Sequence, residues 1–369
     1  MVASLIACWH SCRANGQQGN NREEQLRVVA KNMHKQLNDS IKLAKSIDVH
    51  AHAVLDQSMG AAGEHGPELI ETEGQPSLFR VGGYELHGVK YRDSAFMDVN
   101  KRIARMSTAG IDFQILSPNP LTYFHHIDAP SAISFCKRHN DCLIDLVKQH
   151  PDKLAGFAAL PMQDIPAACE ELRRAVTELG LLAAYIGTDI GQPLDGAALD
   201  PLYETCLELN IPLFIHPAPA GIDGPPGDPH LSRFDLALTT GFAASETIAV
   251  SSIIFGEVLE RHPGLDICVS HGGGAVPYLV GRLAQASRVR AWSPESLHKD
   301  GAFEEMLAKL WFDSNVHDPR SFKLLADVVG TDRLVLGTNF AGWDQAEIHH
   351  SPDFLMLMAD NARQLLRIT

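Results

Sequence analysis

The sequence has no apolar run as long as the roughly 18 residues that a membrane-spanning helix needs, so we expect no transmembrane segment. Basic residues are also scarce, because 31 lysines and arginines stand against 45 aspartates and glutamates, for a formal net charge of −14. Domains that bind nucleic acid carry a basic stripe, which this chain lacks. We therefore expect neither a membrane nor a nucleic acid among its partners.

Regular cysteine spacing is also missing, which argues against a disulfide framework. The seven cysteines are odd in number and irregularly spaced, which is typical of a reduced, cytoplasmic protein. Cys8, His10 and Cys12 form one small cluster with spacing that a metal ion could use. The opening residues MVASLIACWH are too short and too weakly basic to predict a signal peptide. No glycine-rich nucleotide-binding motif is present.

The composition that remains is that of a globular protein, with 45% hydrophobic and 21% charged residues. Residues 1–21 are expected to be unstructured, since GQQGNN is polar and flexible, and residues 22–45 carry a helical pattern of modest apolar content. We predict that residues 1–45 form a flexible N-terminus and a helical arm. Residues 46–369 are then a single domain, since one α/β barrel often uses this length.

Eight apolar runs of strand length alternate with stretches of helical periodicity. Continuous apolar runs indicate strands buried on both faces, as in a parallel sheet. The runs lie at 46–51, 112–117, 154–160, 181–187, 211–215, 265–270, 310–314 and 333–338. The helical stretches lie at 98–109, 130–149, 164–179, 197–209, 241–262, 276–290, 318–329 and 352–367. This order predicts a (β/α)₈ TIM barrel.

Two long connections interrupt the regular alternation. The first, residues 53–97, is rich in glycine and polar residues, with only short apolar stretches. We expect it to lie over the carboxyl face of the barrel as a lid or insertion. The second, residues 217–240, is rich in proline and is expected to shape the mouth of the site.

Histidines stand at several of the predicted strand ends, where barrel enzymes place their chemistry. His50 and His52 are two apart, so on a strand both imidazoles point to the same side and can bind one ion. His216 and His271 end the fifth and sixth strands. Neutral imidazoles suit Zn²⁺, Fe²⁺, Co²⁺ or Mn²⁺. The remaining histidines are expected on the solvated surface, among them His125, His126, His349 and His350.

These residues resemble the amidohydrolase superfamily, and within it the aminocarboxymuconate-semialdehyde decarboxylase-like group. The similarity runs over about residues 46–366. It is carried by Asp48-Val49-His50-Ala51-His52, LPMQ at 160–163, IGT at 186–188, FIHP at 214–217, ET at 246–247, SHGGGAVPYLVGRL at 270–283, DSNVHDP at 313–319, LGTN at 336–339 and Asn361-Ala362-x-x-Leu365.

The resemblance implies roles for individual residues. His50, His52 and His216 match three metal-binding histidines, and His271 matches the histidine that activates the metal-bound water. Arg282 matches an arginine that reaches the substrate carboxylate of the neighbouring subunit in the family's dimer. Arg92 lies near the place of a second substrate-binding arginine. An arginine offers a forked, permanently charged clamp for a carboxylate.

We therefore expect a metal-dependent lyase or hydrolase that acts on a small carboxylate derived from an aromatic ring. The cofactor is a divalent metal ion, with zinc first and iron or manganese as alternatives. The match at Arg282 implies a homodimer, with a hetero-oligomer as the alternative assembly, and the cysteines favour a cytoplasmic location.

One position departs from the family's pattern. The family has a metal-binding aspartate followed by an aromatic residue and proline, where this chain has Asn339 within VLGTNFAGWD. An asparagine ligates a metal more weakly than a carboxylate and cannot act as a base. One interpretation is that Asn339 binds the metal or forms a hydrogen bond, and that Asp344 supplies the missing carboxylate.

Two other interpretations of the asparagine at position 339 remain open. The site could be rebuilt as a dinuclear iron or manganese–iron oxygenase, with ligands from Glu64, His65 and Glu68 in the first loop and with His271 as a further ligand. The chain could also be a catalytically silent subunit of a hetero-oligomer.

Overall fold

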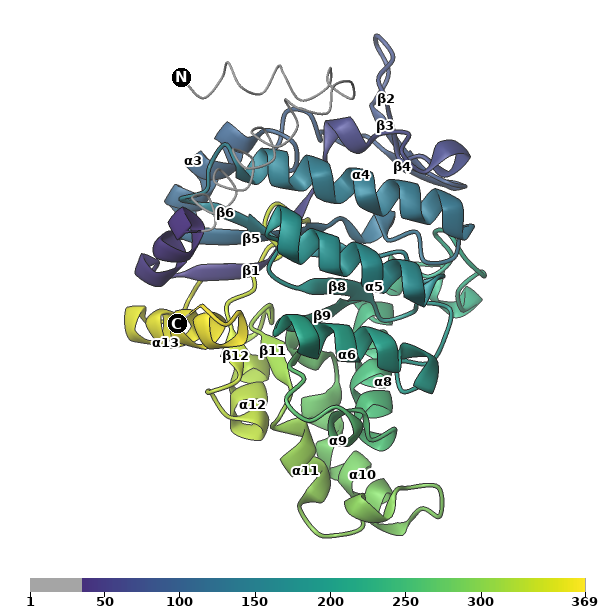
Figure 1. Ribbon diagram of the computed structural model, residues 1–369, viewed down its shortest axis with the longest axis vertical. Coiled ribbons are helices and arrows are strands. Elements are labelled where there is room, and N and C mark those ends of the chain that lie inside the picture. Colours follow the sequence, from purple (N-terminus) through teal and green to yellow (C-terminus); the bar gives the residue numbers. More distant parts are fainter. Residues whose placement is uncertain (1–34, 369) are drawn as a thin grey trace, which may run out of the picture.

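The computed structural model describes residues 35–368, and within them the chain forms a barrel of parallel strands (Figure 1). The barrel strands are β1 (Ile47–Ala53), β5 (Phe113–Pro118), β6 (Leu154–Gly156) with β7 (Ala158–Ala159), β8 (Ala184–Gly187), β9 (Leu213–His216), β10 (Ile267–Val269), β11 (Trp311–Asp313) and β12 (Leu334–Val335). β6 and β7 act as one strand interrupted at Phe157, whose N–H donates to the Leu116 carbonyl of β5. Parallel bridges Asp48–Leu336 and Ala51–Phe340 close the barrel.

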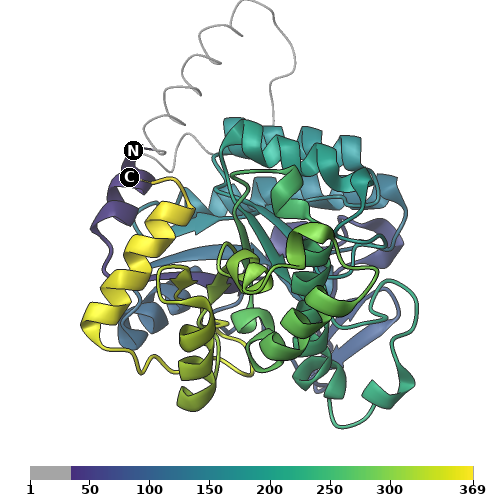
Figure 2. The ribbon, with the colours of Figure 1, turned by 90° about the horizontal axis from the view of Figure 1, so that it is seen from below.

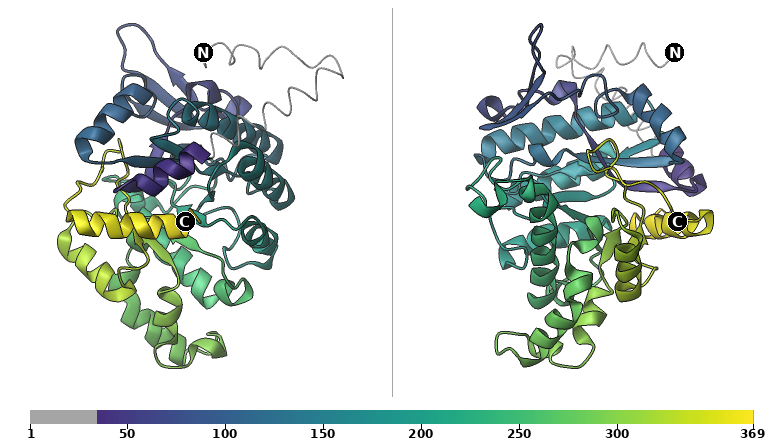
Figure 3. Two further views of the ribbon diagram at one scale, coloured as in Figure 1. Left: turned by 60° about the vertical axis from the view of Figure 1, so that its left-hand side comes forward. Right: turned by 180° about the vertical axis from the view of Figure 1, so that it is seen from behind.

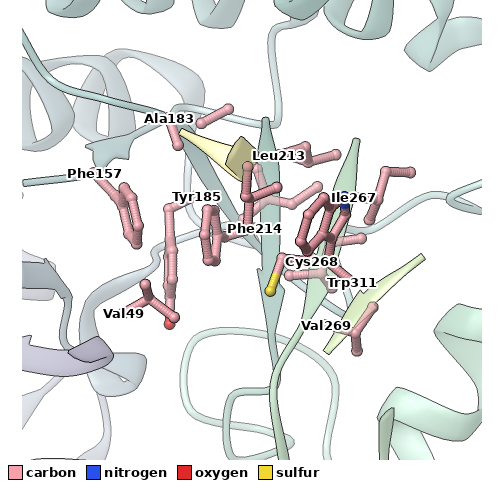
Figure 4. Packing of buried hydrophobic residues seen from close by; sticks show 14 of the residues in the cluster. Val49, Phe157, Ala183, Tyr185, Leu213, Phe214, Ile267, Cys268, Val269 and Trp311 are labelled. Atoms are coloured by element: carbon pink, nitrogen blue, oxygen red, sulfur yellow. The ribbon is translucent and has the colours of Figure 1, made fainter. Parts of the chain in front are cut away.

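The barrel strands are buried along their whole length, as their continuous apolar runs predict. Buried apolar side chains of neighbouring strands pack against one another (Figure 4). Phe157 stacks on Phe214 with ring centroids 4.2 Å apart, and on Tyr185 with ring centroids 6.0 Å apart. The barrel is therefore a packed core, and its chemistry must lie at the strand ends.

Helices surround the strands on the outside (Figure 2). The principal ones are α3 (Val99–Ala109), α4 (Ala129–Val147), α5 (Ile165–Arg174), α6 (Asp200–Leu209), α8 (Gly241–Phe255), α10 (Val276–Val289), α12 (Pro319–Val329) and α13 (Pro352–Leu365), with short α7 (Leu236–Thr239), α9 (Val258–Arg261) and α11 (Ala302–Leu307). Asp98, Asp128 and Asp164 cap the starts of three of them, because each carboxylate accepts from a backbone N–H of the first turn. The predicted (β/α)₈ barrel is confirmed.

One helical stretch, Leu236–Phe255, has the length and apolar composition of a membrane span. It contains Glu246, whose carboxylate is fully buried against the barrel. Apolar helices in the core of soluble proteins have the same composition, so this feature by itself is weak evidence for a membrane.

The first long loop contains a small antiparallel sheet that the sequence did not predict. It consists of β2 (Glu68–Ile70), β3 (Leu78–Val81) and β4 (Tyr84–His87). Gly82 and Gly83 form the turn between β3 and β4, and Gly82 has φ +55°. The strands are too short for a clear periodicity, which is why the sheet was missed. It has a core of its own, in which Phe79 and Val81 lie with Phe124.

Residues 35–43 are helical and pack beside α13 (Figure 3, left). Leu37 and Ile41 are buried, and Arg363 of α13 donates to the Ile41 and Ala44 carbonyls at 3.0 and 2.8 Å. The rest of the predicted arm, and the Cys8–His10–Cys12 cluster, lie outside the described residues.

Candidate metal centre

Four histidines meet at the carboxyl ends of β1, β9 and β10. The ligand atoms of His50, His52 and His216 all lie within 4.8 Å of one another. The Nε2 atoms of His50 and His216 are 3.1 Å apart. The ring of His271 lies 4.9 Å from that of His50 and 5.0 Å from that of His216. The structure thus brings together the four histidines that the sequence singled out.

The Nδ1 atoms of the three clustered histidines all face hydrogen-bond acceptors. His50 Nδ1 lies 2.7 Å from the Asp313 carboxylate. His52 Nδ1 lies 3.0 Å from the Pro118 carbonyl, and His216 Nδ1 lies 2.6 Å from the Pro217 carbonyl. A carbonyl oxygen can only accept, so Nδ1 carries the proton and Nε2 presents a lone pair. This is the arrangement in which histidine binds a metal.

The electrostatics agree with neutral imidazoles. Burial, followed by the neighbouring histidines, lowers the pKa of His52 and of His216 well below the usual range. His52 Nε2 is buried and has no hydrogen-bond partner, and the Nε2 atoms of His50 and His216 face each other. Buried lone pairs without donors fit a cation, so these three residues would hold a divalent transition-metal ion.

His271 is held differently, by a carboxylate on α8. Its Nδ1 lies 2.7 Å from Glu246 Oε1, which also accepts from Ser270 Oγ at 2.5 Å. Burial alone would lower the pKa of His271. The charge and hydrogen bond of Glu246, with further negative charge from Asp313 and Asp344, instead raise the pKa of His271 to about 9. A cation bound among the neighbouring histidines would lower it again.

The glycines after His271 allow α8 to approach this closely. Gly274 has φ +67°, and a Cβ there would clash with the Ala243 carbonyl on the first turn of α8. A side chain at this position would push α8, and Glu246 with it, away from His271. The glycine run therefore has a packing role beside the site.

A buried polar network lies directly beneath the metal-binding histidines. Asp48 accepts from Gln114 Nε2 at 2.9 Å, from Thr338 Oγ1 at 2.8 Å and from the His50 N–H at 3.1 Å. Arg102 of α3 donates to Gln114 Oε1 at 2.5 Å and to the His52 carbonyl at 2.6 Å. Arg102 is 1% exposed, and nothing in the helical pattern around it predicted a buried charge.

Asn339 and Asp344 form a direct pair at the end of the last strand. Asn339 Nδ2 donates to Asp344 Oδ1 at 2.5 Å, and Asn339 has φ +47°. Asp344 Oδ2 lies 3.9 Å from His317 Nε2, and its side chain is 18% exposed. A carboxylate therefore lies beside Asn339, the residue that differs from the family's pattern. Its negative charge contributes to the raised pKa of His271.

The two predicted arginines lie elsewhere. Arg92 donates to Glu71 at 2.7 Å and to Asp56 at 2.8 Å, and its side chain is 45% exposed. Its Nε and Nη1 atoms are thus engaged by two surface carboxylates, and substrate binding by Arg92 stays a prediction. Arg282 is exposed on α10. Within the described residues it has no hydrogen bond or ion pair.

The candidate ligands for a second metal are also placed apart. Glu68 pairs with Arg80 at 2.7 Å, and His65 lies 3.4 Å from Asp128. His65 lines a cavity of about 440 Å³ beside the insertion sheet, whose lining includes none of the four clustered histidines. The structure does not bring this first-loop cluster to the metal centre.

Sequence reasoning missed several residues near the site. His125 was expected on the surface, but it is 5% exposed and its Nε2 accepts from the Gly187 N–H at 3.0 Å. The hydroxyl of Tyr123 lies 3.0 Å from His216 Nδ1. The ring of Phe242 lies 5.9 Å from His216 and 6.0 Å from His271, forming an aromatic wall. Only spatial proximity identifies these side chains.

Comparison with known proteins agrees with the fold and the site. The family model described as amidohydrolase matches residues 47–367. The 2-amino-3-carboxymuconate-6-semialdehyde decarboxylase of Dictyostelium discoideum is 31% identical over 249 residues, which cover 67% of this chain and 68% of that protein. The gamma-resorcylate decarboxylase of Rhodococcus jostii is 32% identical over 271 residues, 69% of this chain and 79% of that one.

Among solved structures, a 5-carboxyvanillate decarboxylase from Novosphingobium aromaticivorans superposes with a TM-score of 0.71 at 22% identity. The superposition covers 87% of this chain and 96% of that one. That structure holds manganese and 4-hydroxy-3-methoxy-5-nitrobenzoic acid. At this identity the likeness establishes the fold.

Proposed function

Since the chain belongs to the amidohydrolase family, we propose that it is a metal-dependent decarboxylase of a small aromatic or ring-derived carboxylate. The observation that carries the proposal is the orientation of His50, His52 and His216, whose protonated Nδ1 atoms leave three converging Nε2 atoms. Relatives of this chain are named as decarboxylases of such carboxylates. Zinc is the metal ion that we expected first. Because a solved neighbour holds manganese, manganese is an equal candidate for the metal of this chain.

His271 is the proposed proton-transfer residue. Loss of carbon dioxide leaves a carbon that must take up a proton, and a histidine close to the reacting atom can supply or move it. Glu246 fixes Nδ1 of His271, so Nε2 is the atom left for substrate or water. A bound divalent ion supplies Lewis-acid polarisation of nearby oxygens. The aromatic wall at Phe242 is suited to an aromatic substrate ring.

Asp344 is proposed to replace the carboxylate that the family carries at position 339. The Asn339 amide holds Asp344 Oδ1 at 2.5 Å, which keeps a negative charge at the end of the last strand. The pair thus retains one carboxylate near the site, although the residue next to the strand is neutral.

A homodimer is proposed to complete the site. Arg282 is exposed and has no partner in the described part of the chain, as expected of a residue that reaches a neighbouring subunit. Large apolar side chains of the same region are also exposed, with Tyr278 82%, Ile248 65% and Trp292 60% exposed. They lie on or just after α8 and α10, which pack against each other. Exposed apolar patches of this kind are typical of protein–protein interfaces.

Metal counting and one variant test the proposal. The purified chain should hold one divalent transition-metal ion, measured by elemental analysis, and should release carbon dioxide from a hydroxybenzoate-type substrate. His271→Ala should keep the metal and lose about 10²- to 10⁴-fold in turnover. Two irons, or a manganese–iron pair, would favour the oxygenase instead. No turnover with any metal would favour a silent subunit.

A further inference from the structure

The metal-binding histidines share a feature beyond their backbone acceptors. His52 Nδ1 lies 2.9 Å from Ser117 Oγ, and His216 Nδ1 lies 3.0 Å from the Tyr123 hydroxyl. Each imidazole therefore has two oxygen atoms at Nδ1, namely a proline carbonyl and a side-chain hydroxyl. The carbonyl fixes which nitrogen carries the proton, and the hydroxyl is a second point that limits rotation of the ring.

The two hydroxyls are connected by a third. The Tyr185 side chain interacts with both Ser117 and Tyr123, and the ring centroids of Tyr185 and Tyr123 lie 5.9 Å apart. All three residues are buried, with 0%, 6% and 4% exposure for Ser117, Tyr123 and Tyr185. A row of three hydroxyl side chains thus connects His52 to His216 through β5, β8 and the loop after β5.

The ring of Tyr185 is fixed independently of its hydroxyl. It stacks on Phe157 with centroids 6.0 Å apart at 14°, and it lies at 26° to the His216 ring with centroids 6.2 Å apart. Removing only the hydroxyl would keep this packing while interrupting the row in the middle. The geometry therefore allows the hydrogen bonds to be tested without a large cavity.

We propose that Ser117, Tyr185 and Tyr123 act as one positioning unit that fixes the ring orientations of His52 and His216 for metal binding. The inference rests on the proposed metal centre, but not on the reaction that the centre catalyses. Outer hydrogen-bond partners of metal-binding histidines typically contribute 10- to 100-fold to metal affinity. Hydroxyls in one buried network also depend on one another, so their contributions should not be additive.

Metal affinity measured by competition with a chromophoric chelator tests this unit. Tyr185→Phe should weaken binding of Zn²⁺ by about 10-fold and change the visible spectrum of the Co²⁺-loaded protein. The matched control is Tyr203→Phe, another buried tyrosine, whose hydroxyl donates to the Leu194 carbonyl at 2.5 Å. It removes the same atom outside the row and should leave Zn²⁺ affinity unchanged.

A double-mutant cycle then tests whether the row acts as a unit. Ser117→Ala and Tyr123→Phe should each weaken Zn²⁺ binding, and the double variant should lose less than the product of the two effects. Wild-type affinity and an unchanged Co²⁺ spectrum in Tyr185→Phe, or independent effects in the cycle, would overturn the proposal. If Tyr185→Phe does not fold, the Ser117 and Tyr123 variants still decide it. A wild-type chain that binds no Zn²⁺ would remove the metal centre itself, whereas metal binding without decarboxylation would contradict only the proposed reaction.

Discussion

Glu246 is the residue that sets the proton affinity of His271. It lies 25 positions before His271 in the sequence and is fully buried, and its carboxylate contacts the Nδ1 atom at 2.7 Å. The sequence offered Glu246 only as part of a short motif. The structure gives it a physical role, because a buried negative charge favours the protonated imidazole.

Glu246→Gln should shift the alkaline limb of the pH profile of kcat/KM. The carboxylate raises the pKa of His271, so its loss lowers that pKa, and the protonated imidazole that supplies the proton is lost at lower pH. The neutral amide also stabilises the protonated ring less well, and we expect kcat to fall about 10- to 100-fold. The profile should be measured with a saturating metal ion. An unchanged limb would mean that His271 does not titrate in the rate-limiting step.

The carboxylate of Asp344 and the amide of Asn339 can be exchanged by substitution. Asp344→Asn should reduce metal affinity and turnover by about 10-fold or more, since it removes a carboxylate near the site. Asn339→Asp alone places two carboxylates at hydrogen-bond distance, which is unfavourable without a shared proton or cation.

The double variant Asn339→Asp/Asp344→Asn exchanges the two groups and should recover most of both properties. Elemental analysis and steady-state kinetics on the three variants measure this. If Asp344→Asn retains the metal and turns over normally, Asp344 is a surface turn residue.

Helix α3 holds the loop that carries this pair. The guanidinium groups of Arg102 and Arg105 each lie 5.3 Å from the centre of the Phe340 ring, which is fully buried. Arg105 also donates to the side chain of Gln345. Asn339 and Ala341 have positive φ values, +47° and +68°, so the backbone of this loop is strained. Contacts from α3 offset that strain and keep the loop in place.

Separate substitutions of the two arginines of α3 give a matched comparison of stability. Arg102→Met should lower the free energy of unfolding by about 3–5 kcal/mol, because it leaves Gln114 Oε1 and the His52 carbonyl without a donor and removes the positive charge near the buried Asp48 carboxylate. Arg105→Met removes an exposed arginine that contacts the same ring, and it should lower the free energy of unfolding by less than about 1 kcal/mol. Urea unfolding of the metal-free proteins compares them. Equal losses would show that the ring contact, rather than the buried charge, stabilises the element.

At the scale of the whole molecule, the site is proposed to be shared between subunits. Each site would then use His271 of one chain and Arg282 of the other. A variant of His271 and a variant of Arg282 can therefore complement each other in a mixed dimer. Random mixing of His271→Ala with Arg282→Ala should restore about a quarter of the wild-type sites, because half of the dimers are mixed and each has one intact site.

Activity after unfolding and refolding the two variants together, compared with each alone, measures this complementation. Ultracentrifugation should show a dimer, and Trp292→Glu should weaken it by burying a charge in the apolar patch. Complementation no greater than the sum of the separate variants would place Arg282 outside the site.

The order of the barrel strands and helices and the approximate position of the site follow from the amino-acid sequence. Periodicity is a local property, and parallel strands bring their carboxyl ends to one edge, so His50, His52, His216 and His271 could be predicted to meet. The insertion sheet was missed because its strands span only three or four residues.

The surroundings of those histidines depend on tertiary packing. His50 and Asp313 are 263 residues apart in the chain, and His52 and His216 are connected through hydroxyls from other strands. Tertiary packing also pairs Arg92 with two surface carboxylates and buries His125. Hydrogen bonds between distant residues depend on how the elements pack, and no local pattern in the sequence records them.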